Sequence, residues 1–132
     1  MKSDAFRSAA EAKDFSKLAD LVSEGVVFRS PVVFKPYEGR DTLGVILAAV
    51  SSVFEDFHYV DQVETGDTAV LRFEARVGDR SVEGVDILGF DDEGRIRDFT
   101  VMVRPMSGMN ALAEAMSAML EQAQGGAGDT GS

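Results

Sequence analysis

Residues 81–104 have the sequence SVEGVDILGFDDEGRIRDFTVMVR, two mainly apolar runs on either side of the acidic turn 91–94. Carboxylates followed by a glycine are typical of the connection between two strands of a hairpin. We therefore expect antiparallel strands at 81–90 and 95–104. The middle of the first strand holds Asp86, a carboxyl group within an otherwise apolar run.

The residues before this hairpin show the two-residue alternation that is typical of a β-strand. Between 68 and 77, apolar side chains alternate with the charged side chains Arg72, Glu74 and Arg76, which is the pattern of a strand with one face against a core. Turn signals on both sides of this segment complete a meander with a further strand at 58–64. The three charged residues would share the outer face, where they suit cross-strand ion pairs in solvent or between subunits.

Helical spacing marks the start of the chain. Apolar residues recur at this spacing from 3 to 22, and Asp14 can cap a second, shorter helix after a break. A short strand at 26–28 then leads into an apolar connection with two prolines at 30–39, which is expected to be extended.

A third helix is expected after Asp41 and Thr42, which can cap its start, and a last helix at about 108–122. Helices ahead of a long curved antiparallel sheet indicate an α+β fold in which the helices cover one face of the sheet. We expect a single domain over 1–122. The remaining residues are rich in glycine and hold no large apolar side chain, which predicts a disordered tail over 123–132.

The composition argues against several classes of function. The chain has no cysteine and one histidine, His58, so we expect no disulfide, no metal site and no cofactor. A formal net charge of −10 disfavours nucleic acid and anionic lipid as partners. The chain starts with charged residues and has no apolar run long enough to span a bilayer, so we expect a cytoplasmic protein without membrane association.

The order of these elements resembles the nuclear transport factor two-like superfamily, which includes ketosteroid isomerases, limonene epoxide hydrolase and the SnoaL-like polyketide cyclases. The resemblance is carried by GVDILGFDDEGRI at 84–96, FRSP at 28–31 and GRD at 39–41, and it covers about 4–104. It implies a cystatin-like cone, in which N-terminal helices pack on a strongly curved antiparallel sheet around a pocket. It also implies a symmetric homodimer.

Three positions of the ketosteroid isomerase pattern can be compared with this chain. Asp86 matches the strand aspartate that forms an oxyanion hole with a tyrosine. The tyrosine position falls on Phe6, which has no hydroxyl, and the position of the proton-moving aspartate falls on Ser30. The isomerase mechanism is therefore not carried over. The two aspartates and the arginine of the epoxide hydrolase pattern are not matched either, because the charged residues nearest that region would face outward.

If Asp86 faces the concave side of the sheet, its apolar neighbours would disfavour the carboxylate form. We then expect a raised pKa for Asp86 and a neutral hydrogen-bond donor near neutral pH. The alternative is a structural carboxylate that pairs with Arg95, Arg97 or Arg104 or that bonds to backbone groups.

Three other polar residues are candidates for the site. His58 could act as a base, because the ordinary pKa of histidine is close to 7, or it could be an exposed or structural residue at a strand start. Tyr37 could donate its hydroxyl over the mouth of the pocket or only cover an edge. Ser30 could orient a polar group of a ligand. Asp86 and His58 are thus the candidate catalytic residues.

Two function hypotheses follow. The first is a pocket protein for a small, mostly apolar, polyketide- or steroid-like ligand, with isomerase-, cyclase- or hydratase-type acid–base chemistry around Asp86. The second is a non-catalytic dimeric binding or interaction module of the same fold. The last helix could pack as an ordinary part of the core, or it could cap the pocket or pack at the dimer interface. The residues expected to line the pocket are Phe6, Phe28, Ser30, Phe34, Tyr37, Leu71, Phe73, Leu88, Phe99 and Val101.

Overall fold

The computed structural model describes residues 1–125, with side chains through Ala118. In chain order its elements are α1 (Asp4–Ala12), α2 (Phe15–Leu21), β1 (Val22–Arg29), β2 (Tyr37–Glu38), α3 (Arg40–Val53), β3 (Glu55–Thr65), β4 (Thr68–Val77), β5 (Arg80–Phe90), β6 (Ile96–Arg104) and α4 (Met106–Gly125). The expected α+β class is confirmed.

The strands form one six-stranded sheet in the order β2-β1-β6-β5-β4-β3. Strands β3 to β6 make the predicted antiparallel meander, and β4 has the predicted bounds. Strand β1 runs parallel to β6 and antiparallel to β2. The sheet is therefore mixed, and not antiparallel throughout as expected. A parallel neighbour needs a long connection, which α3 and the meander provide.

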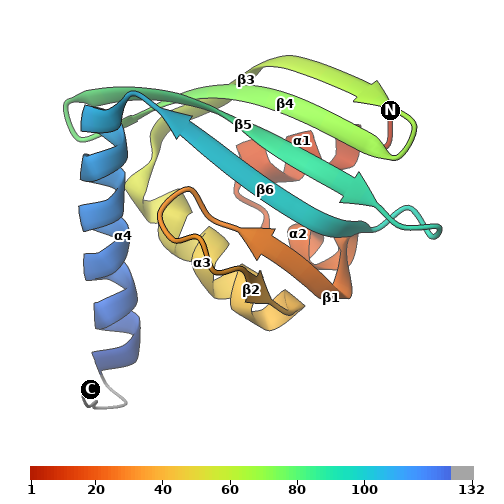
Figure 1. The fold of residues 1–132 in the computed structure, drawn as a ribbon, viewed down its shortest axis with the longest axis horizontal. Coiled ribbons are helices and arrows are strands. Elements are labelled where there is room, and N and C mark those ends of the chain that lie inside the picture. The colour runs from red at the N-terminus through yellow and green to blue at the C-terminus, as the bar shows by residue number, and fades with distance from the viewer. Residues whose placement is uncertain (126–132) are drawn as a thin grey trace.

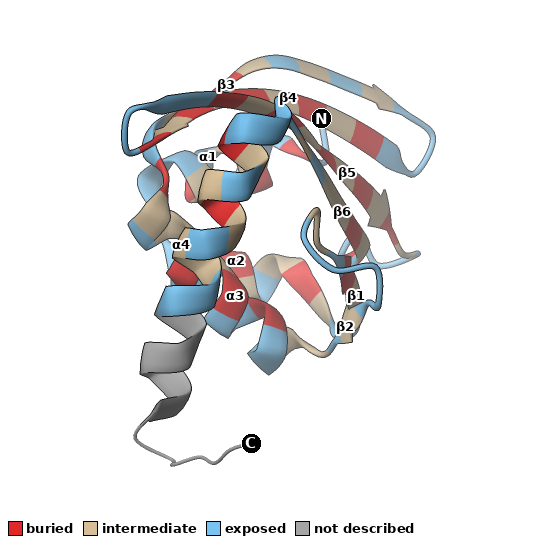
Figure 2. Cartoon of the chain, turned by 60° about the vertical axis from the view of Figure 1, so that its left-hand side comes forward, coloured by how far each residue is buried: buried red, intermediate tan, exposed pale blue. Residues whose placement is uncertain are grey.

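The sheet is curved but open, and the helices pack against its concave face. Helices α1, α2 and α3 lie on that side, and α4 stands at one end of the sheet beside α3 (Figure 1). Buried and partly exposed positions alternate along β4 and β5 (Figure 2). Inward residues such as Leu71 and Phe73 are fully buried, and each contributes about 1.5–3 kcal/mol to stability. The concave face of the sheet thus forms one core with the helices.

The break between α1 and α2 lies where the sequence predicts it. Lys13 ends α1 in a left-handed conformation with φ of 56°. Asp14 caps α2 by accepting a hydrogen bond of 3.2 Å from the backbone N–H of Lys17. The start of α3 differs from the prediction, because Gly39, with φ of 103°, occupies the cap position. Asp41 lies instead in the first turn, where a negative charge still favours the helix.

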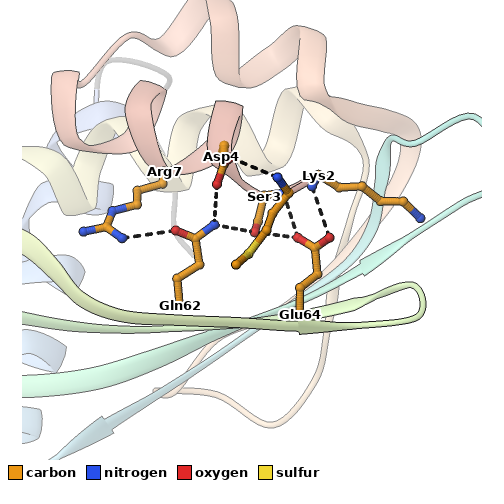
Figure 3. Close-up of polar contacts among 7 residues, drawn as sticks. Lys2, Ser3, Asp4, Arg7, Gln62 and Glu64 are labelled. Carbon is orange, nitrogen blue, oxygen red and sulfur yellow. Dashed lines mark hydrogen bonds and ion pairs between the residues drawn. The ribbon is translucent and has the colours of Figure 1, made fainter.

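A polar cluster fixes the start of α1 against β3 (Figure 3). The buried Ser3 donates from Oγ to Glu64 Oε1 at 2.8 Å and accepts from Gln62 Nε2 at 2.7 Å. Arg7 Nη1 donates to Gln62 Oε1 at 3.1 Å. These bonds hold α1 over the sheet, where Phe6 is buried with 3% of its surface exposed.

Helix α4 covers the predicted last helix and extends beyond both of its ends. Of its apolar stripe, Leu112 is buried and Met116 is partly buried, while Met119 and Leu120 lie outside the described side chains. The tail predicted over 123–132 lies mostly outside the described residues. No helix in the described part of the chain has the length and apolar character that crossing a bilayer requires.

Candidate functional site

A cavity of about 290 Å³ lies between the concave face of the sheet and helices α1, α3 and α4. Its aromatic lining residues are Phe6, Phe28, Tyr37, Phe54, Phe57, Tyr59, Phe73 and Phe99. Several of these rings pack edge to face, as Phe6 does on Phe99 with centroids 5.4 Å apart. Small-molecule sites are usually concave and apolar with few polar groups, and they range from roughly 300 to 1,000 Å³. This cavity has that character and lies at the lower end of the range.

Asp86 is the one carboxylate among the described residues that line the cavity. It lies in the middle of β5, between Leu71 of β4 and Val101 of β6. Asp86 faces the concave side and is 5% exposed. No group of three or more His, Cys, Asp or Glu side chains placed to hold a metal ion occurs in the described part of the chain.

The hydrogen-bond partner of Asp86 is Tyr59 of β3. The Tyr59 hydroxyl donates to Asp86 Oδ2 at 2.6 Å, and both side chains are buried. No described group hydrogen-bonds the second carboxyl oxygen, Oδ1. The arginines considered as alternative partners pair with other carboxylates, Arg95 with Glu93, Arg97 with Asp98 and Arg104 with Glu83.

Burial sets the protonation of this pair. It raises the pKa of Asp86 from 3.8 to about 7, and the hydrogen bond from Tyr59 partly opposes the rise. Burial, together with the nearby Asp86 carboxyl, also raises the pKa of Tyr59 well above its usual range. Near neutral pH, Asp86 is therefore divided between its neutral and ionised forms, while Tyr59 keeps its proton. A neutral Asp86 can donate a hydrogen bond into the cavity.

Tyr59 reaches the cavity because β3 is irregular. Counted back from the turn that joins β3 to β4, an unbroken ladder would place Tyr59 opposite the outward-facing Glu74. A register shift between Tyr59 and Asp61 places Tyr59 opposite Phe73 instead, because one extra residue in a strand turns its side chains to the other face. The sequence reasoning missed Tyr59 for this reason. The one signal in the sequence for an inward Tyr59 is that Phe57 and Tyr59 are aromatic residues two positions apart, which places them on the same face of a strand.

Two side chains of α1 hold this irregular part of β3. The backbone N–H of Tyr59 donates to Glu11 Oε2 at 2.9 Å, and Arg7 Nη2 donates to the backbone oxygen of Tyr59 at 3.0 Å. Arg7 Nε also lies 3.7 Å from Glu11 Oε2. Backbone groups at a bulge lack their regular partners in the neighbouring strand. Glu11 and Arg7 take the place of those partners and so position Tyr59 relative to Asp86.

Gly84 makes space for one wall of the cavity. It lies on the same face of β5 as Asp86 and opposite Phe73 of β4. A Cβ atom at Gly84 would lie 2.6 Å from Phe73 Cζ, closer than real atoms approach. The absence of a side chain at Gly84 therefore lets the Phe73 ring lie beside Asp86.

Seven of the ten lining residues that the sequence predicts lie at the cavity, namely Phe6, Phe28, Ser30, Tyr37, Phe73, Phe99 and Val101, and so does the candidate catalytic residue Asp86. Leu71 and Leu88 do not line it, because neighbouring atoms enclose them completely in the core. Phe34 does not line it either, because its side chain is fully exposed in the loop between β1 and β2. The Ser30 hydroxyl accepts a hydrogen bond of 2.9 Å from the backbone N–H of Val32, which orders the start of that loop.

His58 lies on the outer face of the sheet, away from Asp86. Its Nε2 is 3.4 Å from Glu74 Oε1, and its Nδ1 is 2.8 Å from the backbone oxygen of Asp56. The register that turns Tyr59 inward turns His58 outward, because neighbouring residues of a strand face opposite sides. His58 therefore does not share the cavity with Asp86.

The sequence reasoning also missed the helical wall of the cavity. This wall consists of Ile46, Leu47, Val50, Ser51 and Phe54 from α3 and its end, and Leu112, Ala113, Met116 and Ser117 from α4. Apolar stripes at helical spacing are visible in both segments, but a stripe alone does not distinguish a cavity wall from a filled core. Helix α4 covers one side of the cavity.

The comparisons with known proteins agree with this architecture. The family model of the SnoaL-like domain matches residues 4–99. Among solved structures, a steroid delta-isomerase from Pseudomonas aeruginosa is 44% identical with a TM-score of 0.89, over 94% of this chain and 92% of that chain. No curated protein matches the chain.

Two further solved structures extend the comparison. An uncharacterized protein with a cystatin-like fold from Silicibacter pomeroyi DSS-3 is 32% identical with a TM-score of 0.85, over 89% of this chain and 83% of that chain. A candidate SnoaL-like polyketide cyclase from Shewanella denitrificans OS-217 is 16% identical with a TM-score of 0.66, over 86% of this chain and 95% of that chain. The last likeness shows a shared fold alone.

Proposed function

This chain belongs to the SnoaL-like domain family, and we propose that it binds a small, mostly apolar molecule through a hydrogen bond from Asp86 to an oxygen atom of that molecule. The observation that carries the proposal is a single carboxyl group in an apolar cavity, with a pKa that burial raises to about 7. A neutral carboxyl group donates a hydrogen bond to a carbonyl oxygen, whereas an ionised one repels it.

The cavity walls favour a flat ligand with few polar groups. Aromatic rings line several sides, and stacked or edge-to-face contacts with a ring system would add about 0.5–1.5 kcal/mol for each pair. The volume of about 290 Å³ suits a molecule of a few fused rings or a short polyketide. A carbonyl oxygen at one end of such a molecule would meet Oδ1 of Asp86.

Isomerase- or cyclase-type proton transfer is the second candidate function. It is favoured by the 44% identity to a protein described as a steroid delta-isomerase and by a donor that would stabilise an enolate oxygen. Proton transfer at carbon also needs a base, and the described lining holds no second carboxylate and no histidine. Binding therefore remains the main proposal. Conversion of a β,γ-unsaturated steroid ketone to its conjugated isomer, followed by ultraviolet absorbance, tests the catalytic form.

The outer face of the sheet supports the homodimer as a further proposal. Val63, Val70 and Ile87 are cross-strand neighbours on that face, and Val85 lies beside Met102 on the next strand. Val63 is 62% and Met102 56% exposed. We propose that a second copy of the chain covers this apolar row, because two such rows are alike and a two-fold axis would bring them together.

Binding of a simple ketone across a pH range tests the main proposal. The probe is 2-acetylnaphthalene, whose carbonyl accepts hydrogen bonds and cannot donate one, and calorimetry gives its affinity from about pH 5 to about pH 9. We expect wild-type affinity to fall about tenfold per pH unit above about pH 7, as Asp86 loses its proton.

Three variants complete this test. Asp86→Asn keeps an N–H donor without a titrating group, so its affinity should not depend on pH. Asp86→Leu should bind weakly at every pH, and Asp92→Asn, in the exposed turn, should match the wild type. Wild-type affinity that is independent of pH, or full affinity in Asp86→Leu, would contradict the proposal.

A further inference from the structure

We propose that the ligand is an anion, with a carboxylate or similar group bound by Lys13 at the exposed edge of the cavity. This inference rests on the proposed function, because it adds a second contact to a molecule already held by Asp86. It narrows the ligand class to an apolar scaffold with an oxygen atom at one end and a negative charge at the other.

The charges of the cavity are placed for such a molecule. Among the described lining residues, Lys13 and Asp86 carry the only ionisable groups other than the tyrosine hydroxyls. Asp86 is 5% exposed, whereas Lys13 is exposed at the end of α1. Apolar walls separate the buried carboxyl from the exposed ammonium. A ligand that spans the cavity would therefore meet a hydrogen-bond donor at its buried end and a cation at its outer end.

The Lys13 ammonium has no carboxylate partner among the described residues, although the chain is acidic. Four of the 13 Lys and Arg residues have none within 4.0 Å, and of these four Lys13 alone lines the cavity. The other three are Lys17, Lys35 and Arg40. The nine that do pair are Lys2, Arg7, Arg29, Arg72, Arg76, Arg80, Arg95, Arg97 and Arg104.

The Lys13 side chain is also held in place. Its backbone N–H hydrogen-bonds the last turn of α1, and its Nζ donates to the backbone oxygen of Ser51 at 3.0 Å. Ser51 lies in the last turn of α3, where helix carbonyls favour a positive charge. This structural role uses one of the three N–H donors of the ammonium. The other donors remain for a ligand, and Ser51, which also lines the cavity, gives this edge a further polar group.

Because the protein is strongly acidic, tighter binding of an anionic ligand than of its neutral analogue would indicate a local contact with a cation. A protein with a net charge of −10 repels anions at long range, so without a local contact an anionic ligand would bind more weakly than its neutral analogue. A contact with Lys13 reverses this order. Partly exposed ion pairs have modest strength, which corresponds to affinity about two- to fivefold tighter for the anion at low salt.

A matched pair of ketones tests the inference. The neutral probe is 2-acetylnaphthalene and the anionic probe is 6-acetyl-2-naphthoate, both titrated by calorimetry at about pH 6, where more of Asp86 is neutral. We expect the naphthoate to bind the wild type about two- to fivefold more tightly, and the preference to weaken with added salt.

Variants at two exposed lysines identify the contact. Lys13→Met should abolish the preference for the anion, measured as the ratio of the two affinities within the same variant, and Lys13→Arg should retain this ratio. Lys17→Met is the matched control, because Lys17 is an exposed lysine without a described carboxylate partner and does not line the cavity. It should bind both probes as the wild type does.

Failure of this inference differs from failure of the proposed function. Equal or weaker binding of the naphthoate by the wild type, or an unchanged preference in Lys13→Met, overturns the anionic ligand while the neutral ketone still binds. If neither ketone binds, the proposed function fails and this inference fails with it.

Discussion

The Tyr59 hydroxyl donates a hydrogen bond of 2.6 Å to Oδ2 of Asp86 inside an apolar cavity. In the ketosteroid isomerase pattern the first helix supplies the tyrosine, whereas here that position is Phe6 and β3 supplies the hydroxyl. The Phe6 ring packs on the Tyr59 ring with centroids 6.3 Å apart. The protein thus fixes one oxygen of Asp86 by a hydrogen bond, and no described group hydrogen-bonds the other.

Replacing Asp86 by Asn should change how the free energy of unfolding depends on pH. Asp86 ionises near 3.8 when unfolded and at about 7 when folded. Between these values the folded state holds the additional proton, so wild-type stability is greatest below this window and falls as pH rises through it. The free energy of unfolding of the wild type minus that of Asp86→Asn should decrease by on the order of 4 kcal/mol from about pH 4 to about pH 8. Urea denaturation at both pH values measures it, and a constant difference would contradict the raised pKa.

Replacing Tyr59 by Phe should raise the pKa of Asp86 further, because the hydrogen bond from Tyr59 favours the ionised carboxyl group. Loss of this buried bond should also lower the free energy of unfolding by about 1–3 kcal/mol. Carboxyl NMR titration and urea denaturation check the two effects. Tyr37→Phe is the control, because Tyr37 lines the cavity without a hydrogen bond to Asp86. If Tyr59→Phe and Tyr37→Phe gave Asp86 the same pKa, the hydrogen bond from Tyr59 would not be what favours the ionised carboxyl group.

Gly84→Ala should destabilise the protein, because the new methyl group would collide with the Phe73 ring and with the backbone of β6. Overpacking of this kind costs about 1–3 kcal/mol or more. Gly44→Ala is the matched control, since nothing lies within 4 Å of a Cβ atom at that position of α3. It should stabilise the helix by about 0.5–1 kcal/mol. Thermal unfolding of the two variants should give shifts of opposite sign, and a neutral Gly84→Ala would contradict the close packing.

Replacing exposed apolar residues of the outer face of the sheet by glutamate should dissociate the proposed dimer into monomers. We expect the wild type to have twice the 14.2 kDa mass of the chain by static light scattering, and the double variant Val63→Glu, Met102→Glu to be a monomer. Both residues are exposed, so the fold should persist. Val45→Glu, at an exposed apolar residue of α3, should remain a dimer. A monomeric wild type at micromolar concentration would exclude this interface.

Much of the fold could be predicted because its residues follow regular periods. The alternation around Leu71 and Phe73 determines the inward face of β4, and the turn 91–94 joins two strands as expected. The parallel pairing of β1 with β6 could not be predicted, because no local pattern records which distant edge a short strand joins.

The site could be predicted only in part. Asp86 is identifiable because a carboxyl group stands out in an apolar strand. Tyr59 and His58 could not be assigned to the correct faces of the sheet. The register shift between Tyr59 and Asp61 exchanges the inward and outward positions that simple alternation along β3 would give. Lys13 could not be linked to the cavity, because its position depends on how α1 and α3 meet in space.

Titration of the Asp86 carboxyl group tests the central claim most directly. Carbon-13 NMR of aspartate-labelled protein follows each carboxyl signal with pH, and the signal absent from Asp86→Asn identifies this residue. We predict a midpoint at about 7, because burial in the apolar cavity favours the neutral form. A midpoint near the ordinary value of 3.8 would contradict a neutral Asp86 as the hydrogen-bond donor of this site.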